Sequence, residues 1–282
     1  MQLNLNAVGQ VITTPPFAYD WRDCVLYALG VGAGLDDLDL VHEARQSFQV
    51  VPSFAVLPTM PVAMQALSAV KADFARLVHG EQRMRYHRPL PRRGTLHTKG
   101  RVAAVHDKGK GAVVLIESST HDAHGDLCFD STWSVFCRGQ GGFGGERGED
   151  TPLPDAVGDV ALDATLPTRP EQALLYRLSG DLNPLHIDPG LATAVGFKAP
   201  ILHGLCTYGF ATRAVVRHLC GGDPARLLRF DARFSREVYP GETLRVQARP
   251  TAEANVFRLD VAVGEREVLS HGIVVVHPAE AT

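Results

Sequence analysis

The stretch PILHGLCTYGFATRAVVRHL, residues 200–219, is the longer apolar segment in the second half of this 282-residue chain. Its apolar face is formed by Leu202, Leu205, Phe210, Val215 and Val216. Gly204 and Gly209 lower its intrinsic helicity, but small residues suit close packing against a curved sheet. We therefore expect a central helix that begins near His203–Gly204 and is wrapped by strands.

A faint internal repeat, about 148 residues apart, extends this unit to the whole chain. RDCVLYALG (22–30) resembles EQALLYRLSG (171–180), and MRYHRPLPRRGTL (84–96) resembles ARFSREVYPGETL (232–244). A longer apolar segment lies between these paired motifs in each half. The predicted unit, present twice, is a helix, a long central helix and then a sheet.

Runs rich in β-branched residues follow each copy of the second motif. They are HTKGRVAAV, GAVVLIES and LCFDSTWSVF in the first half, and LRVQARP, VFRLDVAV and EVLSHGIVVV in the second. Short turns such as DKGKG predict antiparallel hairpins. The expected fold class is α+β, with helices on one face of each sheet.

A glycine-rich segment, GQGGFGGERGE (139–149), followed by TPLPDAVG, is typical of a linker. We predict an N-terminal unit over 1–138, a Gly/Pro-rich linker over 139–158 and a C-terminal unit over 159–282. The net charge of −3 predicts no nucleic-acid partner. No signal peptide, membrane span or targeting address is apparent, so we expect a cytoplasmic location and no membrane partner. The five cysteines lack metal or redox spacing and are expected to be packed thiols.

The sequence SGDLNPLHIDP, residues 179–189, has no polar counterpart in the first copy, which continues GVGAGLDDLDL. Turn residues explain such a stretch if each is taken alone, with Asp181 and Asp188 as helix caps. However, Pro184 stops the helix, so Asp181, Asn183 and His186 can converge on one point. A carboxylate, an amide and an imidazole that meet can hold and deprotonate a water molecule.

Gly204 supplies a second candidate element. The first amides of a helix lack intrahelical partners, and the helix dipole is positive there. Glycine lets a ligand approach the backbone closely, so the Gly204 N–H suits a developing oxyanion. Water activation opposite an oxyanion donor suits addition to, or elimination from, a carbon conjugated to a carbonyl group.

The motif YRLSGDLNPLHIDPGLATAVGFKAPILHG (176–204) resembles the hydratase 2 motif of the MaoC-like (R)-specific enoyl-CoA hydratase 2 family. The chain as a whole resembles the two-copy, double hotdog form found in the hydratase 2 domain of peroxisomal multifunctional enzymes of type 2. This resemblance implies reversible hydration of a trans-2-enoyl-CoA to a (3R)-3-hydroxyacyl-CoA. It implies that Asp181 and His186 are the acid–base pair, that Asn183 holds the water and that the Gly204 amide binds the thioester oxyanion.

The same resemblance maps further positions. It implies acyl-CoA contacts for His79, Gly80, Lys108 and Phe234, and structural support for Glu43. The first copy would shape the acyl pocket without catalysing, which favours medium, long or bulky acyl chains. No cofactor or metal is expected, because the CoA thioester is the substrate, and a homodimer is expected by analogy.

Three alternatives stay open at this point. Hotdog proteins include acyl-CoA thioesterases, and hotdog subunits can bind acyl-CoA without catalysis. A short dicarboxylic acyl-CoA, as in mesaconyl-CoA-type hydratases, would need extra arginines in the acyl pocket. Arg83, Arg85 and Arg88 keep that reading open.

Overall fold

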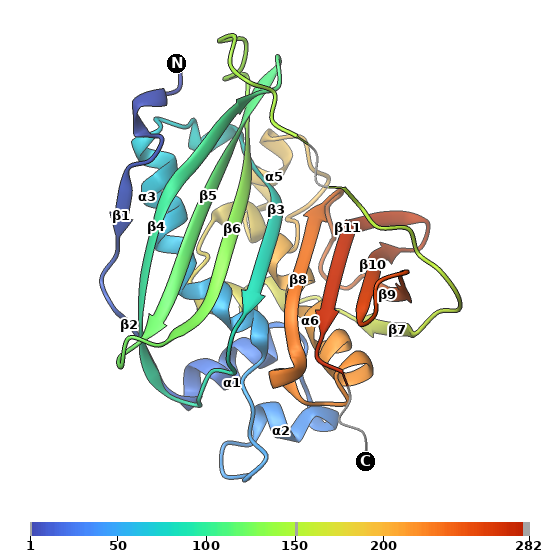
Figure 1. Cartoon of the computed structure of the whole chain (residues 1–282). Helices are drawn as coiled ribbons and strands as arrows, with labels where there is room; N and C mark the ends of the chain where they lie inside the picture. Colours follow the sequence, from blue (N-terminus) through green and yellow to red (C-terminus); the bar gives the residue numbers. More distant parts are fainter. Residues whose placement is uncertain (1, 150–151, 279–282) are drawn as a thin grey trace.

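A single antiparallel sheet forms the framework of the protein in a computed structural model, which describes residues 2–149 and 152–278 (Figure 1). Ten of its strands follow the order β1-β4-β5-β6-β3-β8-β11-β10-β9-β7, and β2 pairs with β4. The first half supplies β1 (Val11–Thr13), β2 (Phe17–Tyr19), β3 (Leu77–Tyr86), β4 (Gly94–Asp107), β5 (Gly111–Asp122) and β6 (Leu127–Arg138). The second supplies β7 (Leu162–Pro167), β8 (Leu227–Phe234), β9 (Thr243–Pro250), β10 (Val256–Val263) and β11 (Arg266–Val276). All six predicted β-rich runs lie in these strands.

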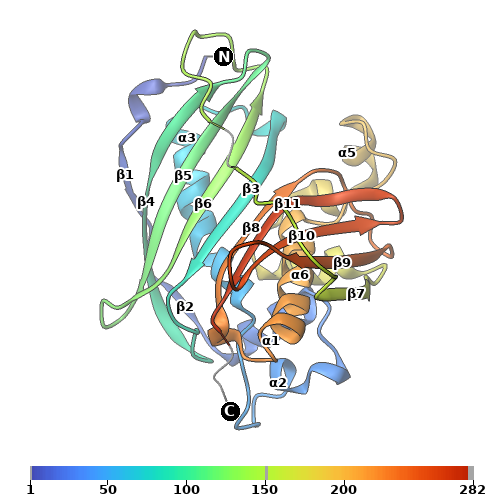
Figure 2. The same ribbon diagram turned by 45° about the vertical axis from the view of Figure 1, so that its right-hand side comes forward.

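One long helix packs against the sheet in each half, α3 (Met60–Ala69) in the first and α6 (Gly204–Leu219) in the second (Figure 2). The other helices are α1 (Trp21–Gly30), α2 (Leu38–Val41), α4 (Gln172–Tyr176) and α5 (Pro189–Ala194). The predicted central helix of the second half is α6, and it begins at Gly204 as expected. Tyr208 on α6 is fully buried, and its hydroxyl donates to the Phe230 carbonyl on β8 over 2.9 Å. The apolar face of α6 is therefore fixed against the sheet.

The central rod of the first half differs from a continuous α-helix. It starts as a 3-10 helix over Pro52–Thr59 and becomes the α-helix α3 at Met60. Pro58 lies inside the 3-10 part and lacks an N–H, so it cannot donate the bond that an α-helix requires at that position. The first half thus keeps a buried central rod, but with a change of helical type.

The repeated helices α1 and α4 pack directly on each other. The Gln172 side chain on α4 donates to the carbonyls of Leu29 and Gly30 at the end of α1, over 3.1 and 2.6 Å. A Cβ on Gly30 would lie 3.3 Å from Tyr176 Cα, so the absence of a side chain permits this approach. The two motifs that revealed the repeat are therefore structurally equivalent and in contact.

Strands β3 and β8 join the halves into one sheet. Glu81 pairs in register with Arg233, and Arg83 with Asp231. On the outer face, Glu81 lies 2.7 Å from Arg233 and Asp231 lies 2.6 Å from Arg85, so ion pairs cross this boundary. We call the β3–β8 pairing the seam.

The glycine-rich segment after β6 is tied to the first half. The Asp107 carboxylate, beside the predicted hairpin between β4 and β5, accepts the amides of Gly142 and Gly144 over 2.8 and 2.7 Å. The Gly142 amide, followed by that of Gly109, lowers the pKa of Asp107 to about 2. The chain then reaches the second half, where the Val157 amide donates to the Pro250 carbonyl. The division at 138 and 159 stays a prediction.

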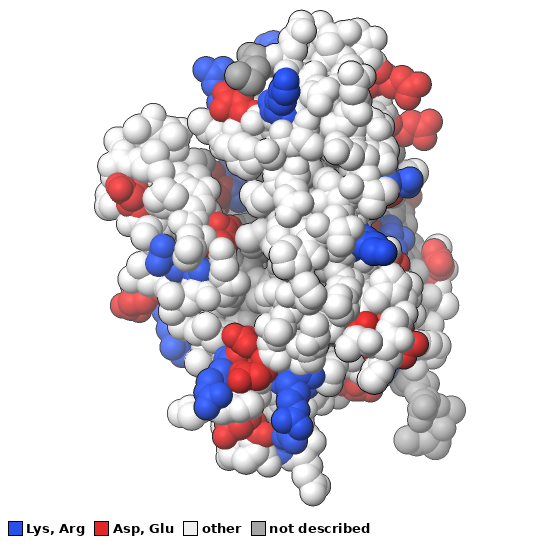
Figure 3. Space-filling model, turned by 90° about the vertical axis from the view of Figure 1, so that its left-hand side faces the viewer, with Lys and Arg blue, Asp and Glu red and all other residues white. Residues whose placement is uncertain are grey.

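Figure 3 shows the face that lies to the left in Figure 1. Lysine and arginine side chains there lie beside aspartate and glutamate side chains, around a broad uncharged centre. Among the helices of the described residues, none is long and apolar enough to cross a membrane.

Candidate active site

The loop between α4 and α5 has the irregular course that Pro184 predicts. Pro184 is the first residue of a short 3-10 helix, Pro184–His186, and the Asn183 side chain caps it by accepting the Leu185 amide over 3.0 Å. Asp188 caps α5 through the amides of Gly190 and Leu191, as predicted. The Asp181 carboxylate accepts the Asn183 amide over 3.2 Å, which forms a turn and not a helix cap.

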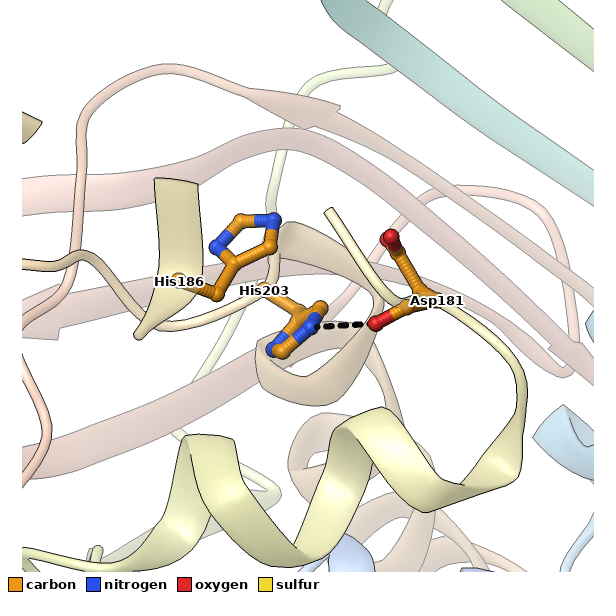
Figure 4. A group of neighbouring side chains, drawn as sticks. All are labelled: Asp181, His186 and His203. Atoms are coloured by element: carbon orange, nitrogen blue, oxygen red, sulfur yellow. Dashed lines mark hydrogen bonds between the residues drawn. The ribbon is translucent and has the colours of Figure 1, made fainter. Parts of the chain in front are cut away.

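Asp181 and His186 lie side by side, together with His203 from the residue just before α6 (Figure 4). One carboxylate oxygen and one ring nitrogen from each histidine all lie within 4.8 Å of one another. Two groups that each bond a water at about 2.8 Å can be bridged by it over up to about 5.6 Å. The predicted pair can therefore share a single water molecule.

His186 is held so that one ring nitrogen remains available. Its Nδ1–H donates to the Ile201 carbonyl over 2.8 Å, and because a carbonyl only accepts, this bond fixes the proton on Nδ1. The side chain is only 9% exposed, and burial lowers its pKa, while the Asp181 carboxylate acts in the opposite direction. At neutral pH the Nε2 lone pair is free to accept a proton.

His203 was not predicted to belong to the site, although it directly precedes Gly204 in the sequence. Its ring stacks on that of His186, with centroids 3.7 Å apart and planes inclined by 28°. Its Nε2 donates to the main-chain carbonyl of Asp181 over 3.1 Å. Burial lowers the pKa of His203 to about 3, so the ring is neutral.

Gly204 is the first residue of α6 and is exposed although its neighbours are buried. A Cβ at this position would meet the Phe234 ring at 3.0 Å, so the absence of a side chain lets that ring lie close to the start of α6. The start of α6 also follows directly after His203, which stacks on His186. The predicted oxyanion donor and the predicted acid–base pair thus occupy one place.

The first half supplies one wall of this site. The His79 ring stacks on Trp133 at 4.2 Å and lies 4.7 Å from the Phe234 ring. Burial lowers the pKa of His79 to about 4, and the Asp181 charge opposes this shift, which places the two groups within electrostatic range. Three predicted substrate contacts, His79, Gly80 and Phe234, are therefore grouped near the predicted acid–base pair.

Gly80 explains how His79 reaches the inner face. The β3–β6 register shifts between His79 and Glu81, which marks a β-bulge at Gly80. Without the bulge, His79 and Glu81 would share a face of the sheet. With it, His79 packs inward on Trp133, while Glu81 pairs with Arg83 outside.

Other predicted positions lie apart from this group. Lys108 is in the β4–β5 hairpin, and β4 is three strands from β3 in the sheet order. Glu43 is partly buried in the turn after α2, where its main-chain carbonyl accepts from Arg92. Asn183 is exposed and its side-chain oxygen serves as the cap, which leaves its NH2 group available to hold water. The roles of these three residues stay predictions.

The three arginines behind the dicarboxylic alternative are all paired with carboxylates. Arg83 lies 2.6 Å from Glu81, Arg85 lies 2.6 Å from Asp231, and Arg88 lies 2.8 Å from Asp126. Arg83 and Arg85 alternate with the buried Met84, so they occupy the outer face of the sheet. Their positions do not favour recognition of a second carboxylate on the acyl group.

The group Asp181, His186 and His203 also has the composition of a metal site, but its geometry is unsuitable. Ring-nitrogen lone pairs lie in the imidazole plane, so two stacked rings direct them side by side and not toward one ion. Zinc would need nitrogens at about 2.0–2.1 Å. The arrangement suits proton transfer better than metal binding.

Fold and site together define a two-copy hotdog protein, with the predicted acid–base pair in its second copy against a wall from its first. The model of the MFE-2 hydratase 2 N-terminal domain matches residues 17–139, and that of the MaoC-like domain matches residues 155–270. The 3-hydroxyacyl-thioester dehydratase Y of Mycobacterium tuberculosis is 43% identical, over 97% of this chain and 98% of its own. The chain therefore belongs to the MaoC-like family, in the two-domain form that carries the hydratase 2 N-terminal domain.

Solved structures agree with this assignment. A MaoC-like dehydratase from Phytophthora capsici is 31% identical, with a TM-score of 0.85, over 98% of this chain and 99% of its own. The peroxisomal multifunctional enzyme type 2 of Drosophila melanogaster is 37% identical, with a TM-score of 0.82, over 95% of this chain and 49% of its own. A Mycobacterium tuberculosis protein described as a double hotdog shares the fold at 17% identity and a TM-score of 0.59, over 96% of each chain. The predicted double hotdog fold is confirmed.

Proposed function

We propose that this protein catalyses the reversible hydration of trans-2-enoyl-CoA to (3R)-3-hydroxyacyl-CoA. The observation that carries the proposal is the approach of Asp181 and His186 to within 4.8 Å, beside the exposed Gly204 that begins α6. Hydration of a conjugated thioester needs a base for water, a proton donor for C2 and stabilisation of the enolate oxygen. This group offers all three within one loop and one helix start.

In the hydration direction, the water molecule lies between Asp181 and His186. His186 Nε2 accepts one of its protons as the water oxygen bonds to C3, because the Ile201 carbonyl holds the other ring nitrogen protonated. The acid–base pair returns a proton to C2 through Asp181. The hydroxyl group of the water molecule is thereby added to C3 and a proton to C2, and both side chains regain their starting protonation states.

The negative charge that develops on the thioester oxygen needs a fixed donor. The Gly204 amide begins α6, where the helix dipole is positive and the first N–H groups have no intrahelical partners. The same donor serves the reverse reaction, since dehydration passes through the same enolate. Removing one such donor typically costs about 10²- to 10³-fold in rate.

We further propose medium, long or bulky acyl groups as the preferred substrates. Trp133, His79 and Phe234 form an aromatic wall next to the acid–base pair, and such a wall favours apolar chains over crotonyl alone. A cytoplasmic location and a homodimer are likewise proposals. Cell fractionation tests the first against the peroxisome, and light scattering coupled to gel filtration tests the second.

The test of the function is incubation of the purified protein with enoyl-CoAs of graded chain length, from crotonyl upward. The expected result is loss of absorbance of the conjugated thioester, with the (3R)-hydroxy product identified by chiral chromatography. A thiol reagent is added in parallel. Release of free CoA without hydration would identify a thioesterase instead, and neither reaction would identify a non-catalytic acyl-CoA-binding protein.

A further inference from the structure

His203 touches more parts of the site than its burial alone requires. It is 1% exposed and immediately precedes α6, so its backbone is continuous with the Gly204 oxyanion donor. Its ring contacts two others: it stacks on His186, with centroids 3.7 Å apart, and meets Tyr176 at a tilt of 54°, with centroids 4.9 Å apart. A buried ring packed against two others has little freedom to rotate.

The polar edge of the His203 ring connects the start of α6 to the loop that carries Asp181. Nε2 donates to the Asp181 carbonyl over 3.1 Å, across 22 positions of sequence (Figure 4). The other nitrogen, Nδ1, is buried and has no hydrogen-bond partner among the described residues. A proton on Nδ1 would be a buried donor without an acceptor and would leave an Nε2 lone pair facing a carbonyl oxygen. The Nε2–H tautomer avoids both costs.

We propose that His203 is a positioning residue, which holds the Asp181 backbone, the His186 ring and the start of α6 in one fixed arrangement. This proposal rests on the proposed hydratase function. It assigns His203 no proton transfer to substrate, because its one available proton is engaged by the Asp181 carbonyl. The residue acts on the reaction only through the placement of Asp181 and His186.

The hydrogen bond to the Asp181 carbonyl distinguishes this role from simple packing. A packing residue needs only volume and apolar contact, which leucine supplies, whereas the Asp181 carbonyl needs a donor at the place of Nε2. Glutamine can place its amide nitrogen near that position. A displacement of about 1 Å at a reacting group can cost about 10²-fold in rate.

The first test is spectroscopic. In the 15N-histidine-labelled protein at neutral pH, the structure requires opposite neutral tautomers: Nδ1–H for His186 and Nε2–H for His203. Signals are assigned by their loss in His186→Gln and His203→Gln. The Nδ1–H tautomer at His203, or a protonated His203, would overturn the proposal, whatever the activity of the enzyme.

The second test is kinetic and compares His203→Leu with His203→Gln. We expect His203→Leu to lower kcat by about 10- to 100-fold with KM nearly unchanged, and His203→Gln to recover most of that loss. His97, an exposed residue on β4, gives the matched control His97→Leu, which should match the wild type. Thermal unfolding of each variant identifies losses due to misfolding.

The outcomes separate this proposal from the proposed function. If the wild type hydrates no enoyl-CoA, the function fails, while the tautomer measurement still decides whether His203 holds the loop. If the wild type is active and His203→Leu is folded and equally active, the positioning role is wrong. Equal losses in both variants, in proportion to their loss of thermal stability, would also contradict it.

Discussion

A double-mutant cycle on Asp181 and His186 tests whether the two side chains act on one water molecule. The variants are Asp181→Asn, His186→Ala and the combination of both. Asp181→Asn keeps the shape of the side chain and its contact with the Asn183 amide, and removes the charge. His186→Ala removes the base, together with its hydrogen bond to the Ile201 carbonyl.

Non-additive losses are expected because the Asp181 carboxylate and the His186 ring lie within 4.8 Å of each other, close enough to share one water molecule. We expect each single change to lower kcat about 10³-fold, which corresponds to about 4.1 kcal/mol of lost transition-state stabilisation. If both groups serve one water, the second change removes little more. The double variant should therefore lose about 10³- to 10⁴-fold, and not the roughly 10⁶-fold that independent contributions would give.

The assay is the initial rate of absorbance loss for the best enoyl-CoA substrate at saturation. His97→Ala on the exposed side of β4 controls for the loss of a histidine as such. His186→Ala should lower the free energy of unfolding by only about 1–2 kcal/mol, through one lost hydrogen bond and its contact with His203. Near wild-type turnover in either single variant, or additive losses in the double variant, would refute the shared-water reasoning.

Three further outcomes are expected. Burial lowers the pKa of His186, so its base form should persist from neutral pH down to a pH under 6.5. We therefore expect kcat/KM to fall only when the pH drops through that lower value, and a fall centred above pH 7 would contradict this. Gly209→Ala should destabilise the protein by about 1–3 kcal/mol in urea denaturation, since its Cβ would lie 2.3 Å from a Val31 methyl group; unchanged stability would show that the interface can adjust. The pKa of Asp107, about 2, lies below its usual value near 4, so the ionised carboxylate stabilises the fold above pH 4, and this stabilisation is lost as the pH falls toward 2. The difference in stability between the wild type and Asp107→Asn should therefore shrink from pH 4 to pH 2 and stay constant above pH 4.

The irregular course of the loop between α4 and α5 was predictable from the amino-acid sequence because its determinants are local. Pro184 interrupts the helix wherever the loop lies in space, and Gly204 marks the start of α6 by its position in one apolar segment. The role of His203 was missed because its acceptor is a main-chain carbonyl 22 positions earlier. No side-chain pattern encodes such a bond, although the identity of the residue before Gly204 offered a signal.

The first-half wall shows the same limit. The resemblance to the family named His79 and Phe234, but their contact depends on the seam and on the bulge at Gly80. Trp133, which stacks on His79, was not predicted at all, because that stack requires the register of β3 on β6. The 3-10 start of the first central rod had a local signal in Pro58.

The seam between β3 and β8 has a consequence for behaviour on dilution. His79 from the first half packs on Phe234 from the second across a boundary that lies within one polypeptide, so the two walls of the predicted site cannot diffuse apart. A hotdog protein that assembled its site from two separate chains would lose that site as subunits dissociated at low concentration. Here the two halves belong to one polypeptide, so the effective concentration of one half near the other does not change on dilution. Turnover per chain should therefore be the same in a dilute assay as at high concentration.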